Sequence, residues 1–408
     1  MTINLIKRPQ VLVLTSTFPR WDGDREPPFV FELSKRLAEN FNVCVLAPHA
    51  PGIRQEEVLA GIKVIRFRYF FTDWQTVAYN GGILANLKRH RWNYFLIPFF
   101  ILSEFIYLWR ILRTTQIDVI HAHWLIPQGL VAIAARALSG KSPLIVCTSH
   151  GGDLFGLSGR FLTNIKRIII NRIDKFTVVS QAMRDYAYKL TTRRDIEVIP
   201  MGVDLVNQFT PGDSRHNMQD QQNILFVGRL VEKKGARYLI LAMQEILKAH
   251  PRSRLLIAGD GPDKPALLQL SEDTGVASQI SFLGPLENTS LQEQYRRATI
   301  FVGPSVVAAG GDQEGLGLVF VEALGCECAV VASDLPAIKD VVIDGVTGLI
   351  CKQRDSADLA SKVISLLENP ALRQSLGQAG RKHVVDRFDW KIVTHRYADL
   401  IHAMHHQA

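Results

Sequence analysis

The chain has 408 residues, of which 47% are hydrophobic and 21% are charged, and its formal net charge is +8. Single hydrophobic cores stop growing at roughly 250–300 residues, so the length excludes one ordinary domain and predicts two. The composition is that of an ordinary globular protein that needs no disulfide staples.

The positive charge lies in the front half of the chain. Residues 1–203 carry 26 Lys and Arg against 15 Asp and Glu, whereas the remainder carries 21 against 24. This asymmetry predicts an anionic surface facing the front half, and nucleic acid and acidic lipid are both candidates.

The five cysteines show no metal-binding spacing and are expected to be buried thiols in a reducing cytosol. The start of the chain has no signal-peptide pattern.

Short runs rich in Val and Ile alternate with helical segments through the front half. This alternation predicts a parallel sheet that helices cover on both faces. The expected strands are 11–15, 43–47, 62–68, 119–123, 144–149, 176–180 and 196–199, and the expected helices include 29–39, 129–138 and 181–190.

Residues 94–109 form the most apolar stretch, and a basic cluster at residues 88–91 precedes them. A membrane-spanning helix needs roughly 20 apolar residues, so these 16 residues argue against a spanning segment. Two interpretations of residues 88–109 remain, which are a buried core helix and a surface contact with anionic lipid. The basic front half favours the lipid contact.

Four polar residues lie at or just after the ends of expected strands of the front half. His121 and His123 end one strand with both imidazoles on one face, but no third ligand for a metal ion can be placed, so a structural role or a role on the acceptor side is expected. His150 follows the next strand and is expected to project towards a ligand. Asp153 is either a ligand-binding residue or the N-cap of a helix.

The back half repeats the alternation after a polar segment, 200–222, that is typical of a linker. Its expected strands are 224–227, 255–258, 280–283, 300–302, 329–332 and 348–350, and two helices at 371–387 and 390–404 end the chain. The prediction is an α/β protein with two doubly wound, Rossmann-like domains facing across a cleft. We place the domains at residues 1–203 and 204–387, with 388–408 able to pack on the first.

Cationic and acidic groups follow the strands of the back half. Gly228, Arg229 and Lys234 come directly after one strand, where two cations could clamp a diphosphate, although a solvated basic turn is the alternative. Glu314 and Glu322 flank a glycine-containing helix start whose free amides suit phosphate or sugar oxygens. A favourable interaction with the helix dipole is the alternative explanation of the two glutamates.

These motifs together resemble glycosyltransferase family 4, the retaining enzymes with the GT-B fold, over essentially the whole chain. The resemblance is strongest at residues 226–235 and 304–348, and the opening at 18–33 resembles members that build bacterial surface polysaccharides. It implies that Arg229 and Lys234 hold the donor diphosphate, Glu314 lies near the donor sugar and Glu322 binds ribose. It also implies roles for His150 at the catalytic centre, for Leu286 at the base, and for an amide-donating turn of Gly315, Leu316, Gly317 and Leu318.

One loop departs from the family pattern. Many members have two glycines after the first strand, near phosphate and acceptor, whereas residues 20–25 contain only Gly23. The loop is therefore expected to have a different geometry on the acceptor side.

Together with this resemblance, which implies retention of the anomeric configuration, the sequence predicts a metal-independent glycosyltransferase that uses a nucleoside-diphosphate sugar, with uridine as the expected nucleoside. The expected acceptor is a hydroxyl of a saccharide or lipid-linked saccharide, at the inner face of the cell membrane, and no nucleic acid is expected as a partner. The alternatives are a sugar-nucleotide epimerase of the same fold and a non-catalytic nucleotide-sugar binding protein. No cofactor is expected beyond the donor itself.

Overall fold

The computed structural model describes residues 8–21, 23–24, 28–212 and 222–407. The chain divides into two compact units. Unit 1 contains residues 1–179, 184–199 and 394–408, and unit 2 contains residues 180–183 and 200–393. The sequence placed the boundary after residue 203. Of the linker that it predicted at 200–222, residues 213–221 lie outside the described residues.

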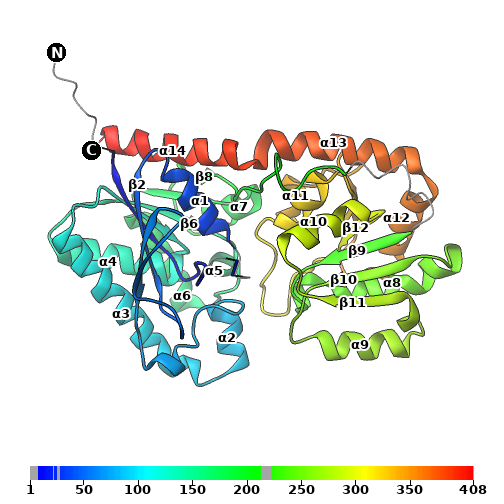
Figure 1. The fold of residues 1–408 in the computed structure, drawn as a ribbon, viewed down its shortest axis with the longest axis horizontal. Helices are drawn as coiled ribbons and strands as arrows, with labels where there is room; N and C mark the ends of the chain where they lie inside the picture. Colours follow the sequence, from blue (N-terminus) through cyan, green and yellow to red (C-terminus); the bar gives the residue numbers. More distant parts are fainter. Residues whose placement is uncertain (1–7, 22, 25–27, 213–221, 408) are drawn as a thin grey trace, which may run out of the picture. The chain divides into compact units, whose positions relative to one another are not determined.

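Unit 1 is built on an eight-stranded sheet with the order β3-β4-β2-β1-β5-β6-β7-β8. Figure 1 labels β2, β6 and β8 of this sheet. Neighbouring strands pair in parallel, with the exception of the antiparallel pair β3 and β4. The strands are β1 (Gln10–Leu14), β2 (Asn42–Pro48), β3 (Glu56–Leu59), β4 (Ile62–Phe67), β5 (Val119–His123), β6 (Leu144–Ser149), β7 (Lys175–Val178) and β8 (Glu197–Val198). Strand β3 was not predicted, because its sequence EEVL carries no apolar run.

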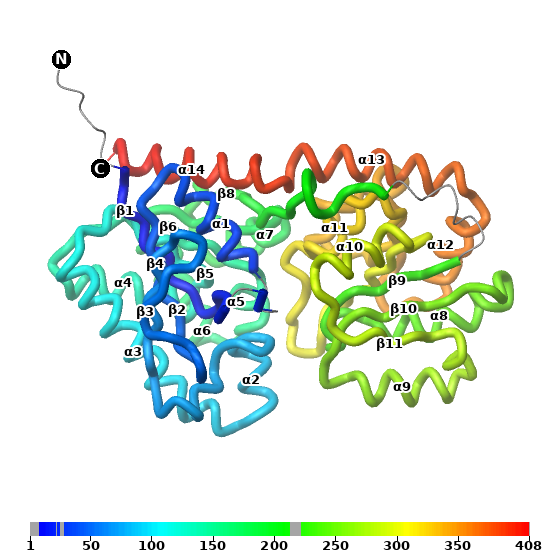
Figure 2. The backbone as a smooth tube through the Cα atoms, viewed as in Figure 1, coloured from blue at the N-terminus to red at the C-terminus, as the bar shows by residue number. Residues whose placement is uncertain are grey.

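The helices of unit 1 connect these strands. They are α1 (Phe29–Leu37), α2 (Ile83–Arg89), α3 (Asn93–Thr114), α4 (Leu130–Ser139), α5 (Gly152–Phe155), α6 (Arg160–Arg172) and α7 (Gln181–Tyr188), of which α7 begins in unit 2. The tube in Figure 2 shows α14 (Trp390–Gln407) beside the strands, and the ring of Phe41 lies 4.7 Å from that of His402. From Thr394 onward α14 therefore belongs to unit 1.

Helix α3 is longer than the apolar stretch that the sequence marked. It has 22 residues, because polar residues extend the 16-residue apolar core at both ends. Within the described residues it is the one helix that is long and apolar enough to cross a membrane, a test that core helices of soluble proteins also pass. The expectation of a segment too short to span was therefore wrong in length.

Unit 2 has a six-stranded, parallel sheet with the order β11-β10-β9-β12-β13-β14. Its strands are β9 (Asn223–Val227), β10 (Arg254–Ala258), β11 (Ile280–Gly284), β12 (Ile300–Gly303), β13 (Ala329–Ser333) and β14 (Leu349–Cys351). Its helices are α8 (Ala236–Ala249), α9 (Lys264–Asp273), α10 (Asn288–Arg297), α11 (Leu318–Gly325), α12 (Ser356–Glu368) and α13 (Pro370–Phe388).

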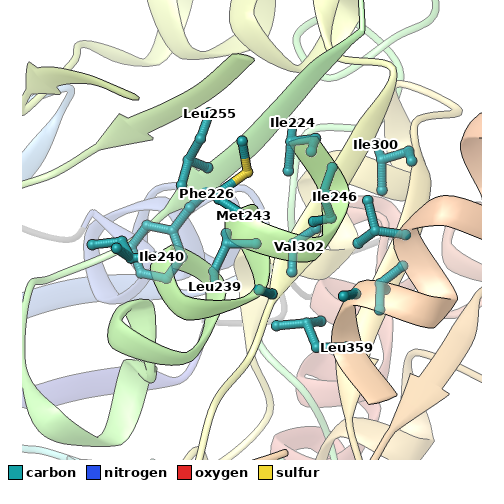
Figure 3. Close-up of a cluster of buried hydrophobic side chains, with 14 of the residues drawn as sticks. Ile224, Phe226, Leu239, Ile240, Met243, Ile246, Leu255, Ile300, Val302 and Leu359 are labelled. Atoms are coloured by element: carbon teal, nitrogen blue, oxygen red, sulfur yellow. The ribbon is translucent and has the colours of Figure 1, made fainter. Parts of the chain in front are cut away.

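The core of unit 2 forms where α8 and α12 pack on one face of this sheet. Figure 3 shows strand residues such as Phe226 and Val302 meeting Leu239 and Met243 of α8 and Leu359 of α12. Burial of each such side chain contributes about 1.5–3 kcal/mol. The packed core holds the strands in register, so the loops at their carboxyl ends have fixed starting points. Those loops carry most of the residues that the sequence singled out.

Candidate active site

Two loops meet at the carboxyl ends of β9 and β12 in unit 2. Lys233 Nζ lies 3.1 Å from Asp312 Oδ1, and the backbone N–H of Val306 donates to the Lys233 carbonyl at 2.8 Å. The N–H of Ala309 donates to Glu232 Oε1 at 3.1 Å. Segment 228–235 and segment 304–317 are therefore held together by charge and by backbone hydrogen bonds, at the position where parallel sheets bind ligands.

Gly235 allows this close approach. Its φ is +68°, and a Cβ atom there would lie 1.8 Å from the carbonyl oxygen of Pro304. Any other residue would push the two loops apart. The glycine at 235 is thus a requirement of the loop contact that places Lys234.

Lys234 and Glu314 form an ion pair at this junction. Lys234 Nζ donates to Glu314 Oε2 at 2.8 Å, and both side chains are largely buried. Burial opposes ionisation of Glu314, but Lys234 and Lys233 outweigh it, so the pKa of Glu314 lies below its ordinary value. The sequence assigned these residues to phosphate and sugar separately, whereas the structure shows them in direct contact.

Glu322 lies in α11 and has a partner that the sequence did not indicate. The hydroxyl of Tyr295, a buried residue of α10, donates to Glu322 Oε2 at 2.9 Å. Burial raises the pKa of Glu322 to about 7, against the lowering effects of Tyr295 and Lys234. A carboxylate held in this way can accept a hydrogen bond from a ligand hydroxyl when ionised and loses much of that capacity when protonated.

The remaining predicted residues of unit 2 also lie on loops at strand ends. Arg229 is exposed after β9, and Leu286 is half-buried after β11. Gly317 precedes α11 with a φ of +86°, and a Cβ atom there would lie 2.6 Å from the ring of Phe320. Residues 315–317 thus lead into α11, whose first residue is Leu318, so the turn that the sequence predicted at 315–318 spans the start of this helix.

In unit 1, His150 follows β6 and contacts other aromatic rings. His150 Nε2 lies 2.9 Å from His123 Nδ1, and the two rings stack with centroids 5.2 Å apart. The rings of Phe29 and Trp124 each have centroids 4.9 Å from that of His150. Burial, with a smaller effect of His121, lowers the pKa of His150 to about 3, so this imidazole is neutral near pH 7.

His123 and His121 continue this contact into the core. Both are fully buried, and their ring centroids lie 4.3 Å apart, as expected for neighbours on one face of a strand. His121 Nε2 lies 2.8 Å from Thr148 Oγ1. Burial lowers the pKa of both groups. Since His123 and His150 are both neutral, one nitrogen of the close pair carries a hydrogen and donates a hydrogen bond, and the other nitrogen accepts it.

Asp153 is buried, and its carboxylate accepts hydrogen bonds from two segments of this region. Its Oδ2 accepts from the N–H of Leu125 at 2.7 Å, and its Oδ1 accepts from the hydroxyl of Ser149 at 2.8 Å. Gly151, and not Asp153, is the N-cap of α5. Asp153 therefore joins the segment after β5, which includes Trp124, to the loop that carries His150.

The loop around Gly23 is closed by an ion pair. The guanidinium of Arg20 contacts both oxygens of Asp24, with Nη2 lying 2.8 Å from Oδ1. Gly23 has a φ of +77° and is exposed. Asp22 and Arg25, which the sequence placed in the same loop, lie outside the described residues.

Across the ranges that the structure describes, no group of three or more His, Cys, Asp or Glu side chains is arranged to hold a metal ion.

Comparisons with known proteins assign the family. Residues 213–383 match the family model "Glycosyl transferases group 1", and residues 28–207 match "Glycosyltransferase Family 4". A GDP-mannose-dependent monoacylated alpha-(1-6)-phosphatidylinositol monomannoside mannosyltransferase of Corynebacterium glutamicum is 31% identical over 302 residues, which cover 71% of this chain and 78% of that protein. The chain belongs to glycosyltransferase family 4.

Solved structures of glycosyltransferases share the fold. Sucrose-phosphate synthase from Thermosynechococcus elongatus has a TM-score of 0.80 at 20% identity, covering 98% of this chain and 100% of that one. Anabaena HepE, in complex with UDP and glucose, has a TM-score of 0.74 at 17% identity, covering 97% of this chain and 100% of that one. The chain is thus a glycosyltransferase with the two α/β domains of the GT-B fold, as the sequence predicted.

The structure brings the predicted residues of this glycosyltransferase together in two groups. In unit 2, Lys234 contacts Glu314, and the pKa of Glu322 responds to Lys234. In unit 1, His150 is joined to His123, for which the sequence offered only a structural or acceptor-side role. Sequence reasoning missed Tyr295 and Trp124 as contacts of these groups, because an aromatic residue in an apolar context carries no signal of its partner.

Proposed function

We propose that this glycosyltransferase transfers a sugar from a nucleoside-diphosphate sugar to a hydroxyl acceptor, with retention of the anomeric configuration and without a metal ion. The observation that carries the proposal is the Lys234–Glu314 pair at the carboxyl ends of the unit 2 strands. Lys234 is a fixed cation in a mostly buried position, where it is worth more to a developing negative charge than in water.

The proposed mechanism assigns separate work to each group. Lys234 and Arg229 stabilise the diphosphate as its bond to the sugar breaks, and the leaving phosphate oxygen helps to remove the acceptor proton. Glu314 orients Lys234 and accepts a hydrogen bond from a donor-sugar hydroxyl. Glu322 accepts one from the ribose, Leu286 packs on the base, and the turn at residues 315–318 donates amides. His150 contributes a neutral ring nitrogen at the reacting centre.

The assignments of the nucleoside and of the acceptor rest on different evidence. The expectation of uridine came from the family resemblance, whereas the relative from Corynebacterium glutamicum is named for GDP-mannose, so both donors belong in the test. That relative's name also specifies a phosphatidylinositol-based acceptor, which supports a lipid-linked saccharide here. We place the enzyme peripherally on the inner face of the cell membrane, in keeping with the basic residues 1–203.

A donor panel tests this proposal. The purified chain is incubated with UDP- and GDP-sugars and a membrane extract, with and without a chelator, and products are identified by mass. We expect one donor to yield a glycosylated lipid at the same rate with and without the chelator. Proton NMR of the initial product should show that the transferred sugar keeps the anomeric configuration that it had in the donor. Chelator-sensitive transfer, or an inverted product, would contradict the proposed mechanism.

A further inference from the structure

Two segments of unit 1 bring six aromatic side chains into one continuous cluster. We call this cluster the aromatic patch; it consists of Phe70, Phe71, Trp74, Trp92, Phe95 and Phe99. Ring centroids lie 5.6 Å apart for Trp74 and Trp92, 4.8 Å for Trp92 and Phe95, and 5.3 Å for Phe70 and Phe99. Residues 70–74 follow β4, whereas the other three lie at the start of α3. The patch is therefore a product of the fold and not of one sequence run.

The patch is exposed. Phe71 is 76% exposed, Trp92 53% and Phe95 48%, and the neighbouring Tyr94 and Leu102 are 59% and 56% exposed. Single exposed apolar residues are common on proteins, but a contiguous group of this kind marks a binding surface. Water contact with so many rings is costly unless a partner covers them.

The opposite face of α3 is packed. Leu96, Phe100, Glu104 and Leu108 are buried at four-residue spacing, and Glu104 accepts a hydrogen bond from Gln128 at 3.1 Å. If α3 crossed a membrane, it would have to leave this packing. The helix can therefore meet a bilayer with its outer face only.

The charges around the patch select the kind of partner. Lys88, Arg89 and Arg91 are exposed immediately before α3, and Arg110 is exposed further along it. Glu104 is the one acidic residue of α3 and is buried, so its outer face has no negative charge. Asp73, in the loop after β4, is the acidic residue within the patch segments. Protein surfaces that lie at the level of the lipid headgroups are typically rich in Trp and Tyr next to Lys and Arg.

We propose that the aromatic patch, together with Lys88, Arg89 and Arg91, docks unit 1 onto the surface of an anionic lipid bilayer. The rings insert to the depth of the headgroups and upper acyl chains, and the three cations contact lipid phosphates. The inference deepens the proposed lipid-linked acceptor and rests on it for its biological meaning. The contact itself requires neither donor nor acceptor, so it can be measured without sugar transfer.

Vesicle flotation of the full chain tests the docking. Vesicles of neutral phosphatidylcholine are compared with vesicles containing anionic phosphatidylglycerol, at low and physiological salt. We expect binding to the anionic vesicles that weakens with salt, and a dissociation constant raised on the order of 100-fold by Lys88→Ala/Arg89→Ala/Arg91→Ala, since each cation contributes about 1 kcal/mol. The matched control, Lys141→Ala/Arg160→Ala/Arg172→Ala, removes three exposed charges of the same unit and should change binding much less.

A second set of variants tests insertion of the rings. Phe71→Ser/Phe95→Ser/Phe99→Ser should weaken vesicle binding at least tenfold, whereas Phe161→Ser, at a ring 76% exposed on α6, should not. Circular dichroism and sedimentation velocity accompany each variant. The proposal fails if the wild-type chain ignores anionic vesicles, or if binding survives both sets. It also fails if the patch variants dissociate an oligomer in the absence of lipid, because the patch would then join copies of the chain.

Discussion

In unit 2 the mostly buried carboxylate of Glu314 keeps its charge, because Lys234 lies 2.8 Å away. In unit 1 three imidazoles, those of His121, His123 and His150, are neutral, because burial lowers the pKa of each and no carboxylate pairs with them in the described contacts. A charged pair suits a leaving group that gains negative charge, whereas a neutral imidazole offers one donor and one acceptor. The two groups therefore should respond differently to substitution and to pH.

Replacement of Lys234 should have the largest effect. We expect Lys234→Ala to lower kcat/KM at least about 100-fold, because the developing diphosphate charge loses a fixed cation. Initial rates measure this with the donor that the panel identifies. Lys233→Ala, which removes the contact to Asp312, is the matched control and should cost much less.

The effect of leaving Glu314 unpaired must be distinguished from the effect of losing the Lys234 cation. Removing one partner of a buried pair typically destabilises a protein by about 3–5 kcal/mol. Lys234→Ala/Glu314→Gln removes the uncompensated charge, so it should recover thermal stability but not activity. Recovery of activity in the double variant would show that Lys234 acts only by neutralising Glu314.

Replacement of His123 tests whether unit 1 acts through His150. His123→Phe keeps a ring in the stack but removes the 2.9 Å contact to His150 Nε2. We expect kcat to fall about tenfold with little change in the donor KM, in the range seen for lost hydrogen bonds to a positioned group. The pH profile of kcat should change as well, because the tautomer of His150 is no longer set.

His121→Phe is the control for packing in the same stack. It changes a ring 4.3 Å from His123 but leaves the His123–His150 contact in place. If both variants lowered kcat equally, His123 would be a packing residue and not a positioning residue.

The pH dependence of donor binding should show the smallest effect. With the pKa of Glu322 near 7, about one tenth of the groups are ionised at pH 6 and about nine tenths at pH 8. We therefore expect the donor KM to rise several-fold as the pH falls from 8 to 6. In Glu322→Gln the donor KM should not depend on pH over this window. Steady-state kinetics from pH 6 to pH 8 measure it, and an unchanged slope in the variant would assign the titration to another group.

The same raised pKa has a consequence for stability. The folded state binds the Glu322 proton more tightly than the unfolded state, for which the ordinary value is 4.5. This group therefore lowers the stability of unit 2 as the pH rises from about 4.5 to about 7. Thermal unfolding should show that Glu322→Gln is less sensitive to pH over this range.

The sequence predicted the strands well, because buried parallel strands are continuous apolar runs and the turns after them are rich in glycine. Strands β5 and β6 begin and end at the predicted residues. The antiparallel β3 was missed, since its alternating, half-exposed residues do not form such a run. The length of α3 was also misjudged, because hydrophobicity alone does not mark where a helix ends.

The sequence by itself determined the family, the two α/β units and the loops on which Lys234 and Glu314 lie, since each of these depends on short local patterns. Only the tertiary structure decided which side chains meet. Tyr295 contacts Glu322 across 27 positions, and residues 70–74 join α3 to form the aromatic patch. Such contacts depend on the order of strands in a sheet and on the paths of loops, which the periodicity of the sequence does not encode.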